Sequence, residues 1–462
     1  MNASGETPSA LVTPDQVLEP FDPLRAEEES FLAGCYVQPR AFSMITGSRS
    51  ALIVGESGSG KTALCQAIER HLCPPDEKPA YLVGRWTLPI PQDAQVEGTN
   101  LVWTQFAQIM DLIARALIRH LVIYPEDWQG AEEWVQDTLH WFLNRYLTVD
   151  LAHLARSLQD GTEEGRGLVH DLATRPVVEV LREEASPDFV AAELMKAVEA
   201  MGLQGVTILV DGVERWLVDR PRLALSLTAF LSTLTLFEKP GFSYKFLLPA
   251  DLEGSLRSAG AVIRTRVDWY RLEWTEAELQ EMVERRLAYA LRVESFSLDR
   301  LAPVDKLLAW LRGCGGESPR GWLHTVRPFL DAYIRGGGKK LSEARFLDLQ
   351  AEYPPRLARE PLTGQFVVGS RLLPPLSEGL DAVLNYLYDR RGRVCPRSRL
   401  YQAYMNANYP DREQEERLRP SDYRGTMDTV LWRLRQEVEP DPANPIFLIT
   451  VKGRGVRLEN AI

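Results

Sequence analysis

The segment Ala51–Thr62 constrains the fold of this chain more than any other. A short apolar run, Ala51–Val54, leads into Gly55-Glu56-Ser57-Gly58-Ser59-Gly60-Lys61-Thr62, and an amphipathic run follows. This order of strand, glycine-rich loop and helix fits the pattern G-x-x-x-x-G-K-[ST] of a phosphate-binding loop, or P-loop. Glycines let backbone N–H groups turn toward phosphate oxygens, and a helix N-terminus adds partial positive charge. The alternative is a glycine-rich turn that binds nothing.

From this pattern we expect the whole loop, Gly55–Thr62, to bind ATP. Lys61 would reach the β and γ phosphates, and the Thr62 hydroxyl would hold Mg²⁺. Val206–Val210 is a second apolar, β-branched run, and it ends in Asp211. In a parallel sheet such a strand delivers its last side chain to the carboxyl edge, where the P-loop also lies. Asp211 would therefore share the Mg²⁺ with Thr62.

Glu214 follows Asp211 by three residues. It is the candidate for polarising the attacking water, so Lys61, Asp211 and Glu214 form the expected catalytic set. The alternatives are that Asp211 only ends a strand and that Glu214 only caps a helix.

Composition narrows the class of protein. The chain has 462 residues and a net charge of −11, which argues against coating of nucleic acid by the whole surface but leaves room for a local DNA-reading face. The five cysteines have no paired spacing, as expected for reduced thiols in a cytosol. No apolar run has the length of a membrane span, and the N-terminus lacks the order of a signal peptide. We therefore expect a cytoplasmic protein without membrane contact.

Between the two halves of the expected site the apolar spacing is mostly helical. Phe106, Ile109 and Ile113 fall on one stripe, and aromatic residues between Trp134 and Tyr146 on another, a pattern typical of core packing. We expect a helical insertion at about residues 101–204, containing a flexible polar loop at residues 161–167. A protein partner at this insertion is one hypothesis for its role.

The order of parts resembles the AAA+/STAND class of ATPases. The P-loop strand, the Asp211–Glu214 segment, a further apolar strand at Tyr244–Pro249 and a helix opened by Trp274–Leu279 follow one another as in that class. Gly315-Gly316-Glu317-Ser318-Pro319-Arg320 resembles the turn that places an arginine on a helical lid facing the nucleotide. The resemblance implies that Arg320 contacts the γ-phosphate; the alternative is a solvent-exposed charge.

Arg264 and Arg266 precede another short strand. Either would reach a γ-phosphate on a neighbouring subunit as an arginine finger, in a homo-oligomer formed through the ATPase domain; the alternative is a pair of surface arginines.

The last hundred or so residues resemble the DNA-binding winged helix of OmpR/PhoB-type response regulators. The resemblance rests on an opening small sheet around Gly369-Ser370, the turn Gly392-Arg393-Val394, the helix pattern Thr426–Arg435 and the closing hairpin Ile449–Leu458. It implies that the third helix enters the major groove and that the hairpin touches the adjacent backbone or the minor groove. The residues expected to face DNA are Arg424, Thr426, Thr429, Arg433, Arg435, Lys452 and Arg454. Acidic residues around this helix leave protein docking as the alternative role.

Together these features predict an α/β protein with a P-loop parallel sheet, a helical insertion, a helical lid and a C-terminal winged helix. The expected ranges are a flexible arm at 1–20, an ATPase core at 21–272, a lid at 273–340 ending in a glycine hinge, a linker at 341–361 and the winged-helix domain at 362–462.

The expected function is a slow, Mg²⁺-dependent ATPase that acts as a switch for binding double-stranded DNA, as a regulator of transcription or of another genome-associated process. The alternatives are a STAND-like signalling or defence ATPase whose winged helix docks a protein, a DNA-remodelling ATPase, and a nucleotide binder without turnover.

Overall fold

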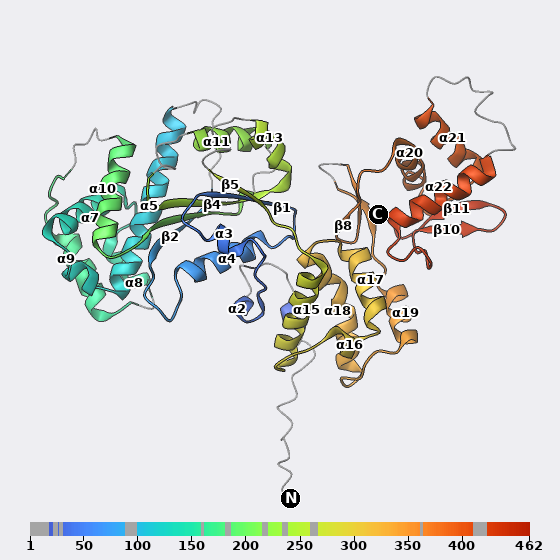
Figure 1. The fold of residues 1–462 in the computed structure, drawn as a ribbon, viewed down its shortest axis with the longest axis horizontal. Helices are drawn as coiled ribbons and strands as arrows, with labels where there is room; N and C mark the ends of the chain where they lie inside the picture. Colours follow the sequence, from blue (N-terminus) through green and yellow to red (C-terminus); the bar gives the residue numbers. More distant parts are fainter. Residues whose placement is uncertain are drawn as a thin grey trace, which may run out of the picture. The chain divides into compact units, whose positions relative to one another are not determined.

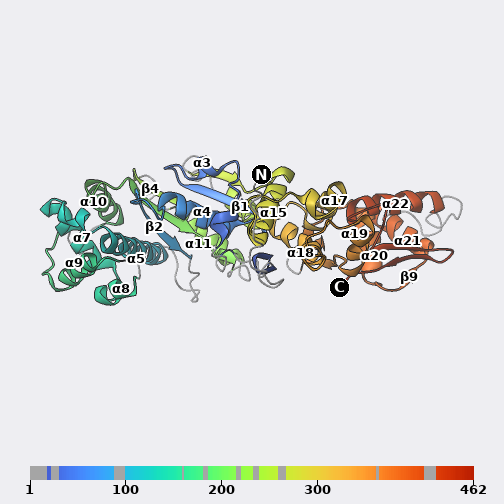
Figure 2. The same ribbon diagram turned by 90° about the horizontal axis from the view of Figure 1, so that it is seen from below.

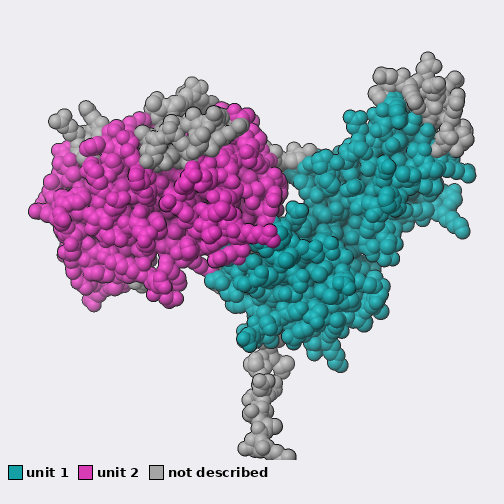
Figure 3. All heavy atoms as spheres, in the orientation of Figure 1, with its two compact units in different colours: residues 1–37, 274–462 teal, residues 38–273 magenta. Residues whose placement is uncertain are grey.

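The structure is a computed structural model that describes residues 18–21, 26, 31–87, 99–158, 161–180, 186–214, 220–232, 239–258, 267–360, 364–409 and 423–462 (Figure 1). The chain divides into two compact units: we call Gln38–Glu273, magenta in Figure 3, the first unit, and Met1–Val37 with Trp274–Ile462, teal in Figure 3, the second unit. Residues 31–37, which the sequence assigned to the ATPase core, thus group with the C-terminal part of the chain. There the Arg285 guanidinium donates to the Tyr36 carbonyl at 3.0 Å, and the rings of Phe31 and Tyr289 stack at 5.2 Å.

A five-stranded sheet in the order β2-β3-β4-β1-β5 forms the centre of the first unit, 38–273. All neighbouring strands pair in parallel. Every residue of β1, β3 and β4 is buried, as in a parallel sheet covered by helices on both faces. The expected parallel α/β sheet is confirmed. Its strands are β1 (Ala51–Gly55), β2 (Tyr81–Trp86), β3 (Gly205–Val210), β4 (Phe242–Pro249) and β5 (Asp268–Arg271).

Helices cover both faces of this sheet. Figure 1 shows α4 (Lys61–Leu72) and the short α3 (Phe42–Ile45) on one face and α11 (Arg220–Ser232) with α13 (Glu253–Ser258) on the other. The chain leaves β1 through α4 and reaches β2 at the far edge, whereas β5 lies on the opposite side of β1. In open parallel sheets ligands bind outside the carboxyl ends of the strands, near such a reversal of direction. The P-loop follows the carboxyl end of β1 and therefore lies along this carboxyl edge of the sheet.

The helical insertion shares one hydrophobic core with the sheet. Its long first helix packs on β2 at Gly84, where a Cβ would lie only 3.3 Å from the Leu112 Cβ. The remaining insertion helices lie beyond the β2 edge in both Figure 1 and Figure 2. Among the described residues, no helix combines the length and apolar character that crossing a bilayer requires. The insertion consists of α5 (Thr99–Ile123), α6 (Glu126–Gln129), α7 (Glu133–Tyr146), α8 (Leu151–Ser157), α9 (Glu163–Thr174) and α10 (Pro187–Ala200).

The expected flexible loop at residues 161–167 is wrong, because α9 begins inside it. The Thr162 side chain caps this helix by accepting from the Gly165 N–H at 2.9 Å. The glycines permit close packing: a Cβ at Gly165 would lie 2.1 Å from the Val122 carbonyl oxygen, and one at Gly161 would lie 2.2 Å from Val122 Cγ1. A run that resembles a linker is therefore a contact between the end of α5 and α9.

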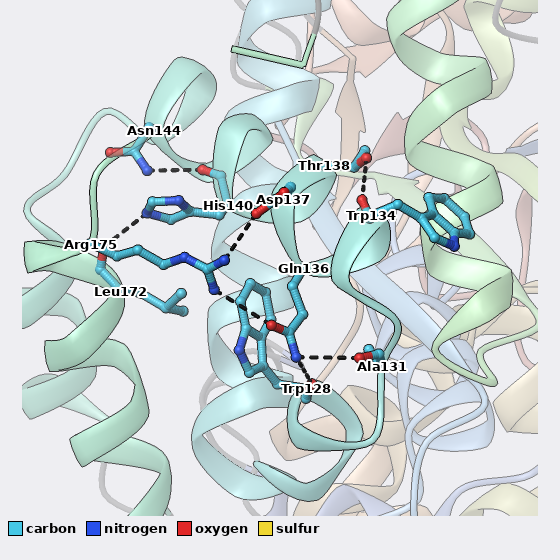
Figure 4. Close-up of polar contacts among 10 residues, drawn as sticks. All are labelled: Trp128, Ala131, Trp134, Gln136, Asp137, Thr138, His140, Asn144, Leu172 and Arg175. Carbon is cyan, nitrogen blue, oxygen red and sulfur yellow. Dashed lines mark hydrogen bonds and ion pairs between the residues drawn. The ribbon is translucent and has the colours of Figure 1, made fainter. Parts of the chain in front are cut away.

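Polar contacts hold α7 to α9 and to the turn before it (Figure 4). Arg175 donates to Asp137 at 2.9 Å, and the Gln136 amide donates to the Trp128 carbonyl at 2.8 Å. His140 Nε2 lies 3.0 Å from the Leu172 carbonyl oxygen. Two of these bonds join residues 38 and 32 apart in sequence, so the insertion is a specifically packed body.

The second unit begins with a group of helices. The segment Trp274–Leu279 opens helix α15, as predicted, and Thr275 and Glu278 form a capping box at its start. Phe346 of α19, which lies in the expected linker, stacks on Phe329 of α18 at a ring distance of 5.0 Å. The helices are α2 (Leu32–Cys35), α15 (Glu276–Leu291), α16 (Leu298–Leu301), α17 (Val304–Gly315), α18 (Pro319–Arg335) and α19 (Glu343–Glu352).

The glycine run after α18 is not a hinge in the structure. The Gly338 N–H donates to the Tyr333 carbonyl at 3.0 Å and the Gly337 N–H to the Ile334 carbonyl at 2.9 Å. These two bonds form a Schellman motif, which needs left-handed residues; φ is +70° at Gly337 and +72° at Gly338. The glycines therefore end α18.

The C-terminal elements form a body with its own hydrophobic core. Two small antiparallel sheets, β6-β7-β8 and β10-β11-β9, enclose three helices. Leu357, in the expected linker, is fully buried in this core. The elements are β6 (Leu357–Arg359), β7 (Phe366–Val368), β8 (Arg371–Leu372), α20 (Glu378–Tyr388), β9 (Val394–Cys395), α21 (Arg397–Asn408), α22 (Tyr423–Val438), β10 (Leu448–Val451) and β11 (Gly455–Leu458).

Candidate functional site

The backbone of the P-loop requires its glycines. Gly58 and Gly60 have φ values of +79° and +89°, in the left-handed region that other residues rarely adopt. A Cβ at Gly55 would lie 2.5 Å from the Ser59 hydroxyl oxygen. The loop is thus a tight turn, with a left-handed backbone at Gly58 and Gly60 and no room for a side chain at Gly55. This geometry fits a cradle of backbone N–H groups for phosphate oxygens.

Lys61 is the centre of the site. It is the first residue of α4 and is 6% exposed. Its Nζ donates to the Gly55 carbonyl at 2.9 Å and to the Glu56 carbonyl at 3.0 Å, and it lies 3.1 Å from the Glu214 carboxylate. The ammonium group is therefore held at the mouth of the loop by partners that a phosphate would replace or join.

The segment after β3 supplies the acidic residues. β4 separates β3 from β1, yet Glu214 reaches Lys61 because both follow the carboxyl ends of their strands. Asp211 lies directly after β3, half-buried, with its N–H donating to the Trp86 carbonyl at 3.3 Å. Thr62, the second residue of α4, is also half-buried. The structure thus brings Lys61 and Glu214 into contact and places Asp211 and Thr62 at the same edge of the sheet.

These residues fit a nucleoside triphosphate with Mg²⁺. The glycine turn would face the phosphates, Lys61 would neutralise their charge, and the Thr62 hydroxyl and Asp211 carboxylate are the oxygen ligands that Mg²⁺ prefers. The bound nucleotide would supply the phosphoanhydride bond, and its Mg²⁺ would neutralise negative charge. The assignments of Lys61, Asp211 and Glu214 to catalysis stay predictions.

Two arginines at this edge escaped the sequence reading. Arg271, the last residue of β5, lies 3.5 Å from Glu56, 3.6 Å from Glu253 and 3.2 Å from Glu273. Arg85 of β2 pairs with Glu69 of α4, and although burial lowers its pKa, nearby groups that include Asp211 raise it overall. Their position at or next to the carboxyl ends of predicted strands was the available signal. The arginine-finger candidates Arg264 and Arg266 lie outside the described residues.

Arg320 is the second residue of α18 and is exposed. The turn before it is ordered: the Ser318 hydroxyl accepts from the Gly321 N–H at 3.2 Å and caps the helix. Arg320 belongs to the second unit, so its contact with the γ-phosphate stays a prediction.

The residues expected to face DNA divide into two groups. Arg424, Thr429 and Arg433 are exposed on α22, and Lys452 and Arg454 are exposed in the turn between β10 and β11. These five form the exposed subset.

Thr426 and Arg435 form the second group, because both are half-buried. Arg435 donates to the Leu448 carbonyl at 2.9 Å and to the Thr450 hydroxyl at 2.7 Å, so it joins α22 to β10.

Trp432 lies between the exposed arginines and also escaped the sequence reading. The residue is 59% exposed, although most tryptophans in globular proteins are largely buried. Its position in the helical repeat could have indicated this exposure, because Trp432 lies off the buried stripe formed by Met427, Val430, Leu431 and Leu434. Asp428, one turn earlier, pairs with Arg397 of α21 at 2.7 Å.

Comparisons with known proteins bear on part of these expectations. No family model matches the chain. "Sensory transduction protein RegX3" of Mycobacterium bovis is 37% identical over 93 residues, 20% of this chain and 35% of that protein. The protein of the same name from Mycobacterium leprae is 35% identical over 94 residues, 20% of this chain and 41% of that protein. The chain therefore spans well under half the length of these relatives.

A solved structure, the crystal structure of Cdc6p from Pyrobaculum aerophilum, aligns over 91% of this chain and 89% of its own, with 13% identity and a TM-score of 0.34. A TM-score at this level does not establish a common fold. The chain thus resembles a sensory transduction regulator over about a fifth of its length. It also contains a parallel sheet that carries a P-loop.

Proposed function

We propose that this protein is an ATP-binding and ATP-hydrolysing switch whose C-terminal winged-helix domain binds double-stranded DNA. The observation that carries the proposal is the P-loop on a parallel sheet, with Lys61 held between the loop carbonyls and Glu214. A nucleotide-sensing site on the same chain as a transcription-factor-like domain favours a regulator of transcription or of another genome-associated process.

The residues of this chain would act as follows in the ATPase half. Lys61 and the loop N–H groups bind and orient the phosphates, and Thr62 and Asp211 hold Mg²⁺. Glu214 leaves Lys61 and orients the attacking water by accepting a hydrogen bond from it. Arg320, on the helical lid, senses the γ-phosphate. Turnover would be slow, because its purpose is to reset the switch.

The DNA-binding half rests on the surface of α22 and the β10-β11 turn. The order helix, strand, helix, helix and hairpin is that of a winged helix, with α22 as the helix for the major groove. Arg424 and Arg433 would contact bases or phosphates, and Lys452 and Arg454 would contact the backbone. The similarity to a sensory transduction regulator supports this reading. Arg435 is a structural residue of the domain in this proposal.

A STAND-like signalling role is the second candidate, because specific surfaces favour a protein partner. Trp432 is 59% exposed in the middle of the α22 face, and Trp134 and Phe189 are 45% and 49% exposed on the insertion. Exposed aromatic residues are enriched at protein interfaces. In this reading the winged helix or the insertion docks a protein.

A selection of binding sites from random duplex DNA tests the proposal, using the full chain with Mg-ATP and with Mg-ADP. We expect an enriched sequence and an affinity that falls as salt rises, with a log–log slope of about −0.9 per phosphate contact. Lys61→Ala should lose nucleotide binding, and with it any difference between ATP and ADP, while keeping its nucleotide-free DNA affinity. No enrichment and no salt dependence would refute DNA binding and favour the docking role.

A further inference from the structure

The lid and the C-terminal domain meet at a closely packed, hydrogen-bonded contact, which we call the α17 seam. It lies within the second unit and joins the end of α17 to the β7-β8 turn and to the end of α22. The seam is formed by Gly313, Cys314 and Gly316 on the lid side and by Gly369, Ser370, Arg371 and Pro440 on the domain side.

Arg371 of β8 bonds to two helix ends at once. Its Nε donates to the Gly313 carbonyl at 2.8 Å, in the last turn of α17. Its Nη1 and Nη2 donate to the carbonyls of Glu437 and Val438, at 3.0 and 3.1 Å, in the last turn of α22. The last carbonyls of a helix lack intrahelical donors and carry partial negative charge. A single planar guanidinium therefore satisfies both ends and holds them together.

A backbone hydrogen bond and closely packed glycines leave little space in the seam. The Ser370 N–H donates to the Cys314 carbonyl at 2.9 Å. A Cβ at Gly313 would lie 2.6 Å from Pro440 Cα, a distance that real contacts do not allow. Gly316 has φ +59°, and a Cβ there would lie 3.2 Å from Arg371 Cα. The lid surface thus fits the domain with no room for an added methyl group.

We propose that Arg371 is a positioning residue that fixes α22 to the last turn of α17, so that the C-terminal domain and the following turn, which leads to Arg320, move as one body. The turn at Gly316–Ser318 leads directly into α18, whose second residue is Arg320. A movement of this turn therefore changes the orientation of α22 and of the β10-β11 turn. The functional consequence rests on the proposed function: the nucleotide bound to the sheet decides how the DNA-binding face is presented.

The test uses the full chain and two variants that act from opposite sides of the seam. Arg371→Met removes the guanidinium and keeps a long side chain. Gly313→Ala leaves Arg371 in place and adds a methyl group against Pro440, while alanine favours the helix α17 itself. Arg371→Lys keeps the charge but lacks the planar guanidinium with its three donors, and it should partly restore the wild-type behaviour that Arg371→Met loses. Arg335→Met, which removes an exposed ion pair with Asp331 on α18, is the matched control.

The first readout is a distance distribution between spin labels at Asp305→Cys on α17 and Ser398→Cys on α21, with Cys73→Ser to prevent side labelling. The wild-type background and Arg335→Met should give one narrow distribution, and Arg371→Met and Gly313→Ala a broad one. A narrow distribution in both seam variants, with unchanged circular dichroism, would overturn the proposal.

The second readout is the ratio of DNA dissociation constants with ADP and with ATP. The wild type should show a ratio of about fivefold or more, and both seam variants a ratio within about twofold, while DNA affinity without nucleotide and ATPase rate stay near wild type. A wild-type ratio retained by both variants would refute the coupling role. Failure of the wild type to bind DNA would refute the proposed function instead, and the distances would still decide whether Arg371 holds the seam.

Discussion

At the scale of single residues, the proposed mechanism gives Glu214 two tasks that follow one another. In the structure its carboxylate lies on Lys61 Nζ at 3.1 Å, where it balances a buried positive charge. A buried charge is costly unless it is paired, so this contact stabilises the nucleotide-free loop. Once phosphates take over that pairing, the same carboxylate is released close to where a water would attack. The ion pair therefore links binding to activation of Glu214.

This arrangement predicts opposite effects of Glu214→Gln on turnover and affinity. Phosphate release should fall by about 100-fold or more, the typical contribution of a positioned general base. ATP affinity should stay equal or rise, because Lys61 loses a competing partner. A phosphate-release assay and a nucleotide titration measure the two quantities, with Glu273→Gln as the control at an exposed carboxylate of the same edge. An unchanged turnover rate would show that Glu214 is not the catalytic carboxylate.

Lys245 is a second buried cation in this unit. It lies on β4 and is 0% exposed, and its Nζ donates to the Gly47 carbonyl at 2.6 Å and to the Arg49 carbonyl. Burial lowers the pKa of Lys245 from 10.5 to about 8, against the opposing influence of Asp268. The residue therefore ties the segment before β1 to β4 at an electrostatic cost.

The shifted pKa of Lys245 predicts how stability depends on pH. Between pH 8 and pH 10.5 the unfolded chain holds the proton and the folded chain has lost it, so stability rises with pH. Below pH 8 both states are protonated and the full cost is present. The free energy of unfolding of wild type minus that of Lys245→Met should therefore rise by roughly 3 kcal/mol across this window. Urea unfolding at several pH values measures it, and a flat difference would contradict the burial argument.

At the scale of elements, α22 combines residues of unlike role within one turn. Arg433 points into solvent, whereas Arg435 binds two acceptors on β10. Residues two apart on a helix face different directions, so the same amino acid serves a surface in one case and a contact between elements in the other. From the sequence alone, both arginines are predicted to contact DNA.

The pair Arg433→Ala and Arg435→Ala separates these roles. Arg433→Ala should weaken DNA binding by about 1–3 kcal/mol and leave the melting temperature unchanged. Arg435→Ala should lower the free energy of unfolding by about 1–3 kcal/mol, because hydrogen bonds from a charged group to β10 are lost. Calorimetry and a DNA titration on the full chain measure both. The assignment fails if Arg433→Ala destabilises the protein and Arg435→Ala does not.

Glycine runs show where local sequence rules mislead at this scale. Residues 161–167 and the glycines after α18 both have the composition of flexible linkers. In the structure one run brings α9 against Val122 and the other ends α18 in a Schellman motif. Glycine permits unusual backbone angles and close approach as readily as flexibility. Which of these applies depends on neighbours that the local sequence does not contain.

At the scale of the whole molecule, the domains expected from composition are not the bodies that the structure forms. The predicted linker contributes α19 to the helices expected as a lid and Leu357 to the C-terminal core, and residues 31–37 join the same group of helices. Lid and C-terminal domain thus share one unit, with Arg371 at the seam between them. In the proposed mechanism, ATP binding would move the lid and the C-terminal domain together as one body.

The sequence by itself determined the P-loop, its strand and helix, the parallel sheet and the succession of helices and hairpin at the C-terminus. These follow from short-range chemistry: periodic burial, glycines at left-handed positions and capping residues. Only the tertiary structure decided that Glu214 meets Lys61, that Arg435 serves the fold and that Arg371 joins two helix ends. The carbonyls bound by Arg371 lie 58, 66 and 67 residues away along the chain. Contacts over such separations depend on how elements pack, which no local pattern encodes.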